Sequence, residues 1–335
     1  MGLYFRHPSS YEHETGAHPE NPRRIAAIEE ALSDRDWMGL ERLEAPAAER
    51  EQLLRVHDPA HIDAIEALAG RGGGMIDMDT VASAGSWVAA LHAAGGAVAA
   101  VDRVLERNGP GFAVCGLRPP GHHAERGRAM GFCLFNNVAV AAAHALAQHN
   151  LANALVLDWD VHHGNGTEAI FYESDAVLYA SVHQSPLYPG TGAPSDLGSG
   201  AGEGYTVNLP VPPGAGSADF LSLVQHVVAP VARELKPGIL FISAGFDAHR
   251  DDPLAQCEVD DDGFRQMAAT MRELGAELGA PVVVCLEGGY SLQALADSVV
   301  ATVEGLQGDG PPAEAAVEPA AEHRTRLAAY WQELG

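Results

Sequence analysis

One short segment concentrates side chains that could hold a metal ion. In Asp158–Gly166, with the sequence DWDVHHGNG, two carboxylates, two imidazoles and a carboxamide fall within eight positions, directly after an apolar run of strand length. Alternate residues of an extended segment share a face, so Asp158, Asp160 and His162 point to the same side. Burying three unpaired polar groups would cost about 1–3 kcal/mol each, whereas a divalent cation satisfies them. The segment therefore predicts a metal site in preference to a polar core.

Three further polar clusters also follow apolar runs. Arg118–His123, with the sequence RPPGHH, presents two adjacent histidines on a backbone that two prolines and a glycine restrict. Paired imidazoles suit acid–base chemistry, although a polar loop with chance histidines is an equal alternative for this cluster alone. Ser243–Pro253 contains Asp247 and His249, and Glu287–Tyr290 has the sequence EGGY.

The apolar runs are predicted to be buried strands of a mainly parallel sheet. Six runs rich in Val, Ile and Leu have strand length: Phe112–Cys115, Ala154–Leu157, Val177–Val182, Tyr205–Leu209, Ile239–Ser243 and Val282–Leu286. Segments with helical patterns alternate with them: Gly85–Glu106, Asn136–His149, Ser217–Leu235, Gly263–Leu278 and Ser291–Leu306. This alternation predicts an α/β fold, a single doubly wound domain flanked by helices. Ligands bind beyond the carboxyl ends of strands in such sheets, so the four clusters should converge on one site.

The two ends of the chain differ from this pattern. Asn21-Pro22 resembles an N-cap followed by proline at the first helical position, which predicts a helix to about Leu32. Residues 308–319, with the sequence GDGPPAEAAVEP, are expected to form a linker before a short helix in Ala320–Leu334. We therefore assign residues 1–307 to the main domain and residues 308–335 to a linker and a short C-terminal helix. The long loop Gln184–Gly204 is a candidate pocket rim.

Composition limits the partners. The chain carries 45 acidic and 20 basic residues, a formal charge of −25, which disfavours binding to nucleic acid. Such acidity would attract polycations, but solubility is its first interpretation. The four cysteines form no CxxC pair, so no disulfide framework is expected. Since no signal-like N-terminus and no run of roughly 18 apolar residues is found, we expect a cytoplasmic protein without a membrane partner.

Together the motifs resemble those of the histone deacetylase family. RPPGHHA, LDWDVHHGNGT, SAGFDAHRDDP and EGGY stand in the family's order, and the resemblance extends from about Tyr4 to Gln307. It implies the arginase/deacetylase fold and a zinc-dependent hydrolase that removes acetyl or other acyl groups from the ε-amine of lysine or a similar amine. Asp160, His162 and Asp247 would hold the zinc. Two carboxylates and one imidazole leave a coordination position open for water, and this oxygen-rich set would also accept Fe(II) or Co(II).

The resemblance also implies a catalytic set around the metal: His122, His123, Asp158, Asn165 and Tyr290. Asp158 would hold the first histidine and Asn165 the second. We expect His123 to take the proton from water and return it to the leaving amine. Tyr290, on the flexible pair Gly288-Gly289, would donate its hydroxyl to the oxyanion, while a core aromatic is the alternative interpretation.

Further sites follow from the resemblance alone. One potassium site would use Asp158, Asp160, His162, Ser181 and Val182. A second potassium site would use Phe171, Ser174, Val177 and Tyr205. An acyl-lysine tunnel would involve Phe132, Tyr188, Leu254, Gly288 and Gly289, with Arg24 at its foot.

Alternative functions differ in what they need from these residues. A ureohydrolase of the arginase type would want a second bridging carboxylate two residues after Asp247, where His249 stands. A non-catalytic acyl-lysine reader would usually have lost a ligand or Tyr290, and none is lost. Within the family, an acetylpolyamine deacetylase is the main alternative to a lysine deacylase, and the apolar Leu254 at the expected rim favours lysine. Whether the chain forms a homo-oligomer is left open.

Overall fold

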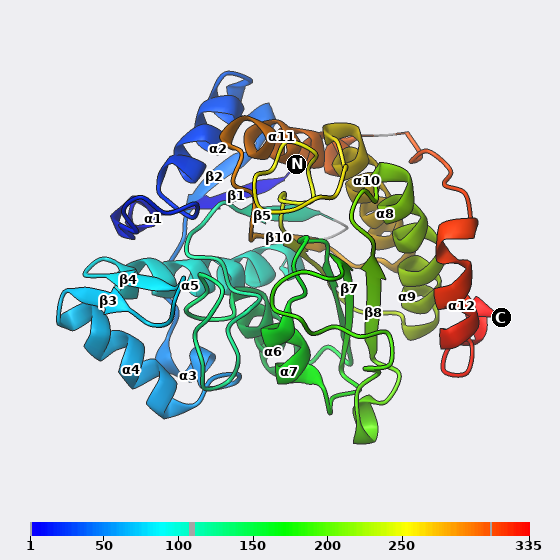
Figure 1. Cartoon of the computed structure of the whole chain (residues 1–335), viewed down its shortest axis with the longest axis horizontal. Helices are drawn as coiled ribbons and strands as arrows, with labels where there is room; N and C mark the ends of the chain where they lie inside the picture. The colour runs from blue at the N-terminus through cyan, green and yellow to red at the C-terminus, as the bar shows by residue number, and fades with distance from the viewer. Residues whose placement is uncertain (1, 107–110, 309) are drawn as a thin grey trace.

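An eight-stranded sheet forms the centre of the computed structural model, which describes residues 2–106, 111–308 and 310–335 (Figure 1). Its strands pair in parallel throughout, in the order β2-β1-β5-β10-β9-β6-β7-β8. They are β1 (Leu3–Arg6), β2 (Glu41–Glu44), β5 (Phe112–Cys115), β6 (Ala154–Asp158), β7 (Val177–Gln184), β8 (Thr206–Val211), β9 (Leu240–Ala244) and β10 (Val282–Leu286). The α/β fold is confirmed, and each of the six expected strands lies within two residues of its predicted bounds.

Two strands and a hairpin lie outside the sequence prediction. β2 reads ERLE and alternates between half-buried and exposed residues, because it is an edge strand and needs no apolar run. β1 is only four residues long and pairs with β5 and β2. A separate antiparallel hairpin joins β3 (Gly73–Met75) to β4 (Val81–Ser83).

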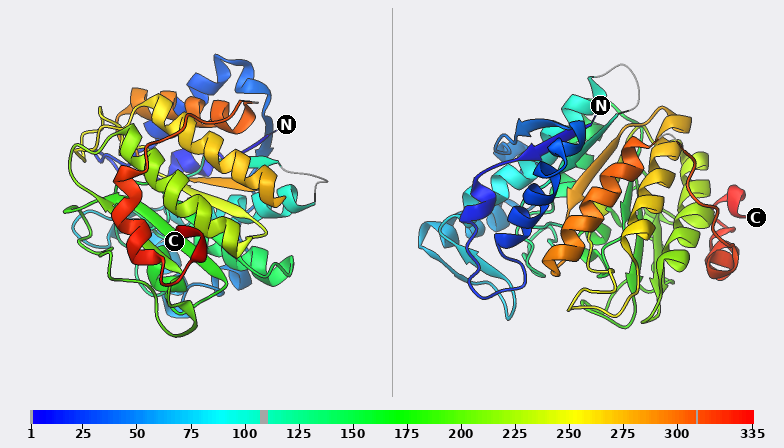
Figure 2. Two further views of the ribbon diagram at one scale, coloured as in Figure 1. Left: turned by 90° about the vertical axis from the view of Figure 1, so that its right-hand side faces the viewer. Right: turned by 90° about the horizontal axis from the view of Figure 1, so that it is seen from above.

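Helices cover both faces of the sheet (Figures 1 and 2). One face packs on α5 (Ser86–Leu105) and α6 (Asn137–Gln148). The other packs on α2 (Arg23–Ser33), α8 (Ser217–Leu223), α9 (Ala229–Leu235), α10 (Asp261–Leu278) and α11 (Leu292–Gln307). The remaining α-helices of the described residues are α1 (Ser9–Glu12), α3 (Arg50–Leu53), α4 (Pro59–Gly70), α7 (Asn165–Phe171) and α12 (Ala321–Leu327). Successive strand residues serve the two cores in turn, as Val282 and Val284 do on one side and Val283 and Cys285 on the other.

One predicted helix starts close to its expected position and another is corrected in detail. α2 spans Arg23–Ser33, one residue after the predicted start at Pro22, and the Asn21 side chain accepts a hydrogen bond from the Arg23 N–H at 3.1 Å, as expected of an N-cap. The segment Ser217–Leu235 is continuous, but a π-helical turn at Val224–Val228 separates α8 from α9. Helix α6 lies within its predicted range Asn136–His149, and Asn136 caps it, since its Oδ1 accepts from the Ala139 N–H at 3.0 Å.

Helix α5 is long and apolar enough to cross a membrane by length and composition alone. In this fold it packs against β1, β5 and α6 instead, and 61 % of its most apolar stretch is buried inside the protein. The helix therefore has the character of a core helix.

The C-terminal segment lies against the outer side of the helical layer formed by α8 and α9 (Figure 2). Leu327, Trp331 and Leu334 join the core on that side, and the Trp331 indole donates to the Gly204 carbonyl at 2.9 Å. Residue 309 of the expected linker is outside the described residues. The tail thus adds apolar burial near the far edge of the sheet.

Candidate active site

A pocket of about 220 Å³ opens at the carboxyl ends of the strands. It is lined by Asp79, His123, Gly131, Phe132, His162, Leu187, Tyr188, Leu254 and Tyr290. His123, His162 and Tyr290 come from three of the sequence clusters, and Leu254 follows the fourth directly. The predicted convergence of the clusters is therefore present in the fold.

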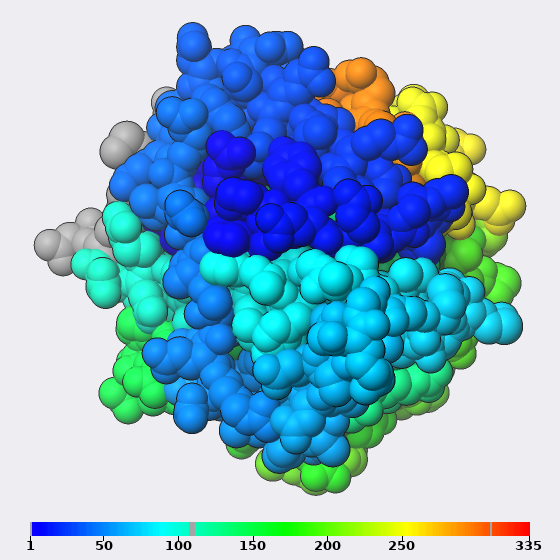
Figure 3. Space-filling view, turned by 90° about the vertical axis from the view of Figure 1, so that its left-hand side faces the viewer, coloured from blue at the N-terminus to red at the C-terminus, as the bar shows by residue number. Residues whose placement is uncertain are grey.

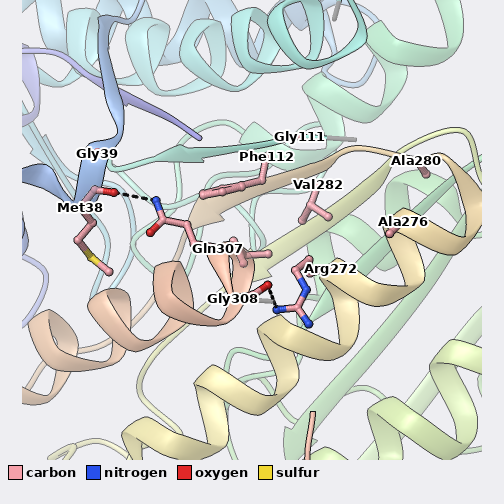
Figure 4. A pocket seen from close by; sticks show the side chains of 12 residues that line it. Met38, Gly39, Gly111, Phe112, Arg272, Ala276, Ala280, Val282, Gln307 and Gly308 are labelled. Carbon is pink, nitrogen blue, oxygen red and sulfur yellow. Dashed lines mark hydrogen bonds between the residues drawn. The ribbon is translucent and has the colours of Figure 1, made fainter. Parts of the chain in front are cut away.

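A larger cavity, of about 580 Å³, lies at the opposite end of the strands (Figure 4). Phe112 and Val282, the first residues of β5 and β10, line it. Its polar groups are engaged: Gln307 Nε2 donates to the Met38 carbonyl at 2.8 Å, and Arg272 donates to the Gly308 carbonyl at 2.5 Å. None of its lining residues belongs to the clusters, so its size does not make it the site of chemistry.

Three of the expected metal ligands meet beneath the smaller pocket. Asp160 and His162 follow β6, and Asp247 follows β9, its neighbour in the sheet. One ligand atom from each lies within 4.8 Å of the other two. His162 Nδ1 is 3.1 Å from both Asp160 Oδ1 and Asp247 Oδ2. This is the donor set of two carboxylates and one imidazole that the sequence predicts.

The two buried carboxylates of this set favour a bound cation. Both carboxylates are fully buried, and burial raises the pKa of Asp247. Burial also acts against an ionised Asp160, yet the charges of His122 and His162 hold its pKa below the usual range. Burial lowers the pKa of His162, but its hydrogen bonds to both carboxylates outweigh this effect and raise the pKa to about 10. Two ionised carboxylates buried this close together repel each other, and a cation held between them offsets that repulsion.

A second group of possible ligands has a different explanation. Asp102, His144 and His149 also bring ligand atoms together, and both imidazole Nε2 atoms lie 2.7 Å from Asp102 Oδ1. The Arg55 guanidinium donates to His144 Nδ1 at 2.9 Å, so a neutral His144 carries its proton on Nε2. That nitrogen then has no lone pair for a metal, and the group is best described as a hydrogen-bond network.

The paired histidines are held as the sequence predicts. His122 Nδ1 is 3.0 Å from Asp158 Oδ2, and His123 Nδ1 is 2.8 Å from Asn165 Oδ1. Burial alone lowers the pKa of each histidine. The carboxylates of Asp158 and Asp160 outweigh burial at His122 and raise its pKa, whereas His123 has only a carboxamide partner and its pKa stays low. One imidazole is therefore cationic and its neighbour neutral.

Glu287 is a buried residue whose role the sequence analysis missed. Its carboxylate accepts hydrogen bonds from the Gly121 N–H at 2.6 Å, the His122 N–H at 3.1 Å and the Ser243 hydroxyl at 2.9 Å. Burial raises its pKa to about 7. Because these partners come from two chain segments, and Glu287 itself belongs to a third, its carboxylate fixes the loops that carry three of the clusters relative to one another.

Tyr290 lies at the pocket, but the glycines before it are held rather than flexible. The Gly288 N–H donates to Asp160 Oδ2 at 2.8 Å, and a Cβ there would lie 2.1 Å from Asp247 Oδ2. Gly289 has φ +119°, which favours glycine, and its carbonyl accepts from Arg24 Nε at 2.6 Å. Neither glycine is among the described residues that line the pocket. Their function here is to let the loop pass close to the carboxylates.

Asp252 anchors the same loop from the other side. Its Oδ2 atom accepts from the Tyr290 N–H at 2.6 Å and from the Ser291 N–H at 3.3 Å, and burial raises its pKa to about 7. The Tyr290 ring packs edge-on against Phe132, with ring centroids 5.8 Å apart, and the Arg24 guanidinium lies 5.1 Å from its centroid. Tyr290 is thus a positioned wall of the pocket and not a core aromatic.

Arg24 belongs to a buried ionic network beneath the pocket. Glu20 contacts the guanidinium groups of both Arg118 and Arg24, and all three side chains are fully buried. Arg118 also donates to the Ser10 carbonyl at 2.6 Å. These contacts tie the RPPGHH segment to the N-terminal loops, and Glu20 has no signal in the sequence beyond its place in HPENP.

The expected tunnel residues Phe132, Tyr188 and Leu254 all line the pocket. Leu187 and Asp79 line it too and were missed. Asp79 corrects the expectation of an apolar rim, because it places a carboxylate in the same cavity as Leu254. It precedes β4, and nothing in a single Asp near a short hairpin distinguishes it from a surface residue.

Some of the expected potassium ligands lie next to one another in the fold. Asp158 and Ser181 are paired residues of β6 and β7, and Val182 follows Ser181. In the second set, the Ser174 N–H donates to the Phe171 carbonyl at 2.9 Å, while the Tyr205 carbonyl accepts from Tyr179 at 2.9 Å. Both potassium sites stay predictions.

Comparison with known proteins agrees with this geometry. Residues 18–306 match the model of the histone deacetylase domain. A probable deacetylase of Methanothermobacter thermautotrophicus is 41% identical over 90% of this chain and 90% of its own length. A histone deacetylase-like amidohydrolase of Pseudomonas aeruginosa is 39% identical over 87% of this chain and 76% of its own length. The crystal structure of the HDA15 HD domain superposes with a TM-score of 0.90 at 37% identity, covering 99% of this chain and 97% of that chain. The chain therefore belongs to the histone deacetylase family, as its fold, its convergent clusters and these relatives show.

Proposed function

We propose that this protein is a zinc-dependent deacylase that removes acetyl or other acyl groups from the ε-amine of lysine. The observation that carries the proposal is the buried set of Asp160, His162 and Asp247 at the base of a pocket that also contains His123 and Tyr290. A metal-binding acid–base site under a pocket with aromatic and aliphatic walls suits an amide on a long apolar side chain.

The donor set fits a catalytic divalent ion. Three protein ligands leave a coordination position for the reacting groups, unlike the closed four-ligand set of a structural zinc site. Carboxylate oxygens also suit Fe(II) or Co(II), so these metals are alternatives. A single ion is favoured because His249, where a ureohydrolase would place a bridging carboxylate, accepts from the Asp251 N–H at 3.0 Å and lies outside the ligand group.

When bound, the metal supplies Lewis acidity toward the amide carbonyl and toward water. His123 is in the protonation state that a general base needs, because burial and the neighbouring cationic His122 lower its pKa. The Asn165 amide nitrogen donates to Glu125 Oε1 at 2.8 Å, so its oxygen faces His123 and accepts the Nδ1 proton. The lone pair of His123 is therefore on Nε2, where it can take a proton from water and pass it to the leaving amine.

His122 and Tyr290 complete the acid–base and oxyanion arrangement. The cationic His122 lies against Asp158 and stabilises negative charge near the reacting carbonyl. The Tyr290 hydroxyl is kept protonated because burial raises its pKa, so it remains a hydrogen-bond donor to the oxyanion. The backbone contact to Asp252 holds this tyrosine at the pocket.

The direct test combines metal analysis with turnover. Purified protein should contain one divalent ion per chain, hydrolyse acetyl-lysine peptides, lose activity on chelation and regain it with zinc. Asp247→Asn should lose both metal and activity, while Asp34→Asn, an exposed change at the end of α2, should keep both. Two tightly bound transition metals per chain, or full activity after exhaustive chelation, would contradict the proposal.

A further inference from the structure

A second groove runs beside the candidate active site. It has a volume of about 490 Å³ and lies between α4 with the following residues and the segment at Gly127–Ala129. Ile65, Leu68 and Ile76 give it apolar walls, and Arg71 and Arg128 are exposed at it. Figure 3 looks onto the side of the molecule that carries α4 and the β3–β4 hairpin (blue to cyan).

The same two chain segments line the groove and the mouth of the pocket. Asp77 and Arg128 line the groove, while Asp79 and Phe132, a few residues further on in the same two segments, line the pocket. The Phe132 N–H donates to Thr80 Oγ1 at 3.2 Å and joins the segments between the two cavities. A peptide whose acyl-lysine enters the pocket therefore has neighbouring residues within reach of the groove.

The two arginines differ from the others in the part of the chain that the structure describes. Every other described arginine side chain contacts a carboxylate, a carbonyl, a carboxamide, an imidazole or an aromatic ring. The side chains of Arg71 and Arg128 have no hydrogen bond, ion pair or ring contact among the described residues. The chain has 45 acidic and only 20 basic residues, so two guanidinium groups without such contacts in one groove are unusual.

Other groups facing the groove do not neutralise these arginines. Asp77 accepts from the backbone N–H groups of Asp79 at 3.1 Å and Thr80 at 2.7 Å, which turns its carboxylate into the hairpin loop. His61 is buried against the Leu134 carbonyl, at 2.8 Å from Nε2, and burial lowers its pKa so that it stays neutral. Positive charge is therefore available to a ligand.

We propose that this groove selects acyl-lysine peptides that carry an acidic residue close to the acyl-lysine, a proposal that rests on the proposed deacylase function. The arginines pair with the Asp or Glu carboxylate, and the apolar walls contact the methylene groups of the same side chain. The groove also repels the distal ammonium groups of a polyamine.

The test compares acetyl-lysine peptides that differ only in flanking Glu, Gln or Lys, at about 0.15 M ionic strength, where long-range attraction is mostly screened. Exposed charge pairs contribute modestly, so we expect Glu peptides to exceed Lys peptides in kcat/KM by about 5- to 10-fold, mainly through KM. The double variant Arg71→Ala/Arg128→Ala should reduce this ratio to about 2-fold or less and leave turnover of a small unflanked acetyl-lysine unchanged. Arg128→Glu should shift the preference toward Lys peptides.

A matched control removes a positive charge elsewhere. Arg233→Ala, on the exposed face of α9 where the arginine pairs with Glu277, should keep the wild-type ratio. Equal turnover of Glu and Lys peptides by the wild type, with normal cleavage of unflanked acetyl-lysine, would overturn the groove proposal while the deacylase function stands. Absence of turnover on every acyl-lysine substrate would overturn both.

Discussion

Replacing Asn165 by aspartate tests whether His123 is the general base. In the wild type, His123 Nδ1 is 2.8 Å from a neutral carboxamide oxygen, and the pKa of this histidine is below its usual value of about 6.5 because of burial and the charge of His122. A carboxylate at the same position would stabilise the imidazolium. The pKa of His123 should therefore rise.

The size of this rise depends on Glu125. At about 4 Å between charge centres and an effective dielectric constant of about 20, a carboxylate–imidazolium attraction is about 4 kcal/mol before desolvation, and opposite charges typically shift a pKa by about 1–3 units. However, Glu125 Oε1 lies 2.8 Å from the Asn165 amide nitrogen and would face the new carboxylate. Two carboxylates this close share a proton, so Asn165→Asp alone should give the smaller shift. Asn165→Asp/Glu125→Gln restores a donor and should give about 2 units, or about 2.7 kcal/mol.

The assay is the pH dependence of kcat/KM on an acetyl-lysine substrate between about pH 5 and 9, which reports groups of the free enzyme. A base must be neutral to accept a proton, so a raised pKa moves the acidic limb to higher pH and lowers the rate at about pH 6 more than at about pH 8. Metal content is measured in parallel to exclude loss of the ion. If the acidic limb of the double variant stays in place or moves to lower pH, His123 is not the base.

The remaining predictions address the oxyanion, stability and substrate. Tyr290→Phe should keep fold and metal but lower kcat by about 10²–10³-fold, because a donor to the oxyanion is lost. His123→Ala should be at least as damaging. Near-normal turnover of Tyr290→Phe would refute the oxyanion role of this tyrosine. His57 is buried with its pKa lowered to about 3, so the unfolded chain binds the extra proton below about pH 6.5 and stability falls as pH decreases from there toward about 3. Urea unfolding at about pH 7 and 5 should show a loss of about 2 kcal/mol that shrinks in His57→Gln, whereas an equal loss in this variant would assign the effect to other groups. In competition at about 0.15 M ionic strength, acyl-lysine peptides should be cleaved with higher kcat/KM than acetylspermidine or acetylputrescine, and a preference for acetylpolyamines would contradict the role proposed for the arginine groove.

The sequence by itself predicts the α/β fold and the place where the chemistry-bearing clusters meet. Apolar runs such as Val282–Leu286 predict buried strands because a strand enclosed on both faces has to be apolar at every position. Polar residues directly after such runs lie at the carboxyl edge of a parallel sheet, which is why the four clusters could be expected to converge on one site. Position relative to the strands was sufficient for that convergence, whereas the resemblance to the family singled out Asp160, His162 and Asp247 as the expected zinc ligands.

Only the tertiary structure decides what surrounds that chemistry. The edge strand β2 and the hairpin β3–β4 carry weak local signals, since their residues are half exposed and their pairing is set by distant segments. For the same reason Glu287 as a link between loops, Asp79 at the pocket and the shared groove of Arg71 and Arg128 were not visible in the sequence. Each depends on segments far apart in the chain meeting at a particular distance, and packing of the whole domain sets that distance.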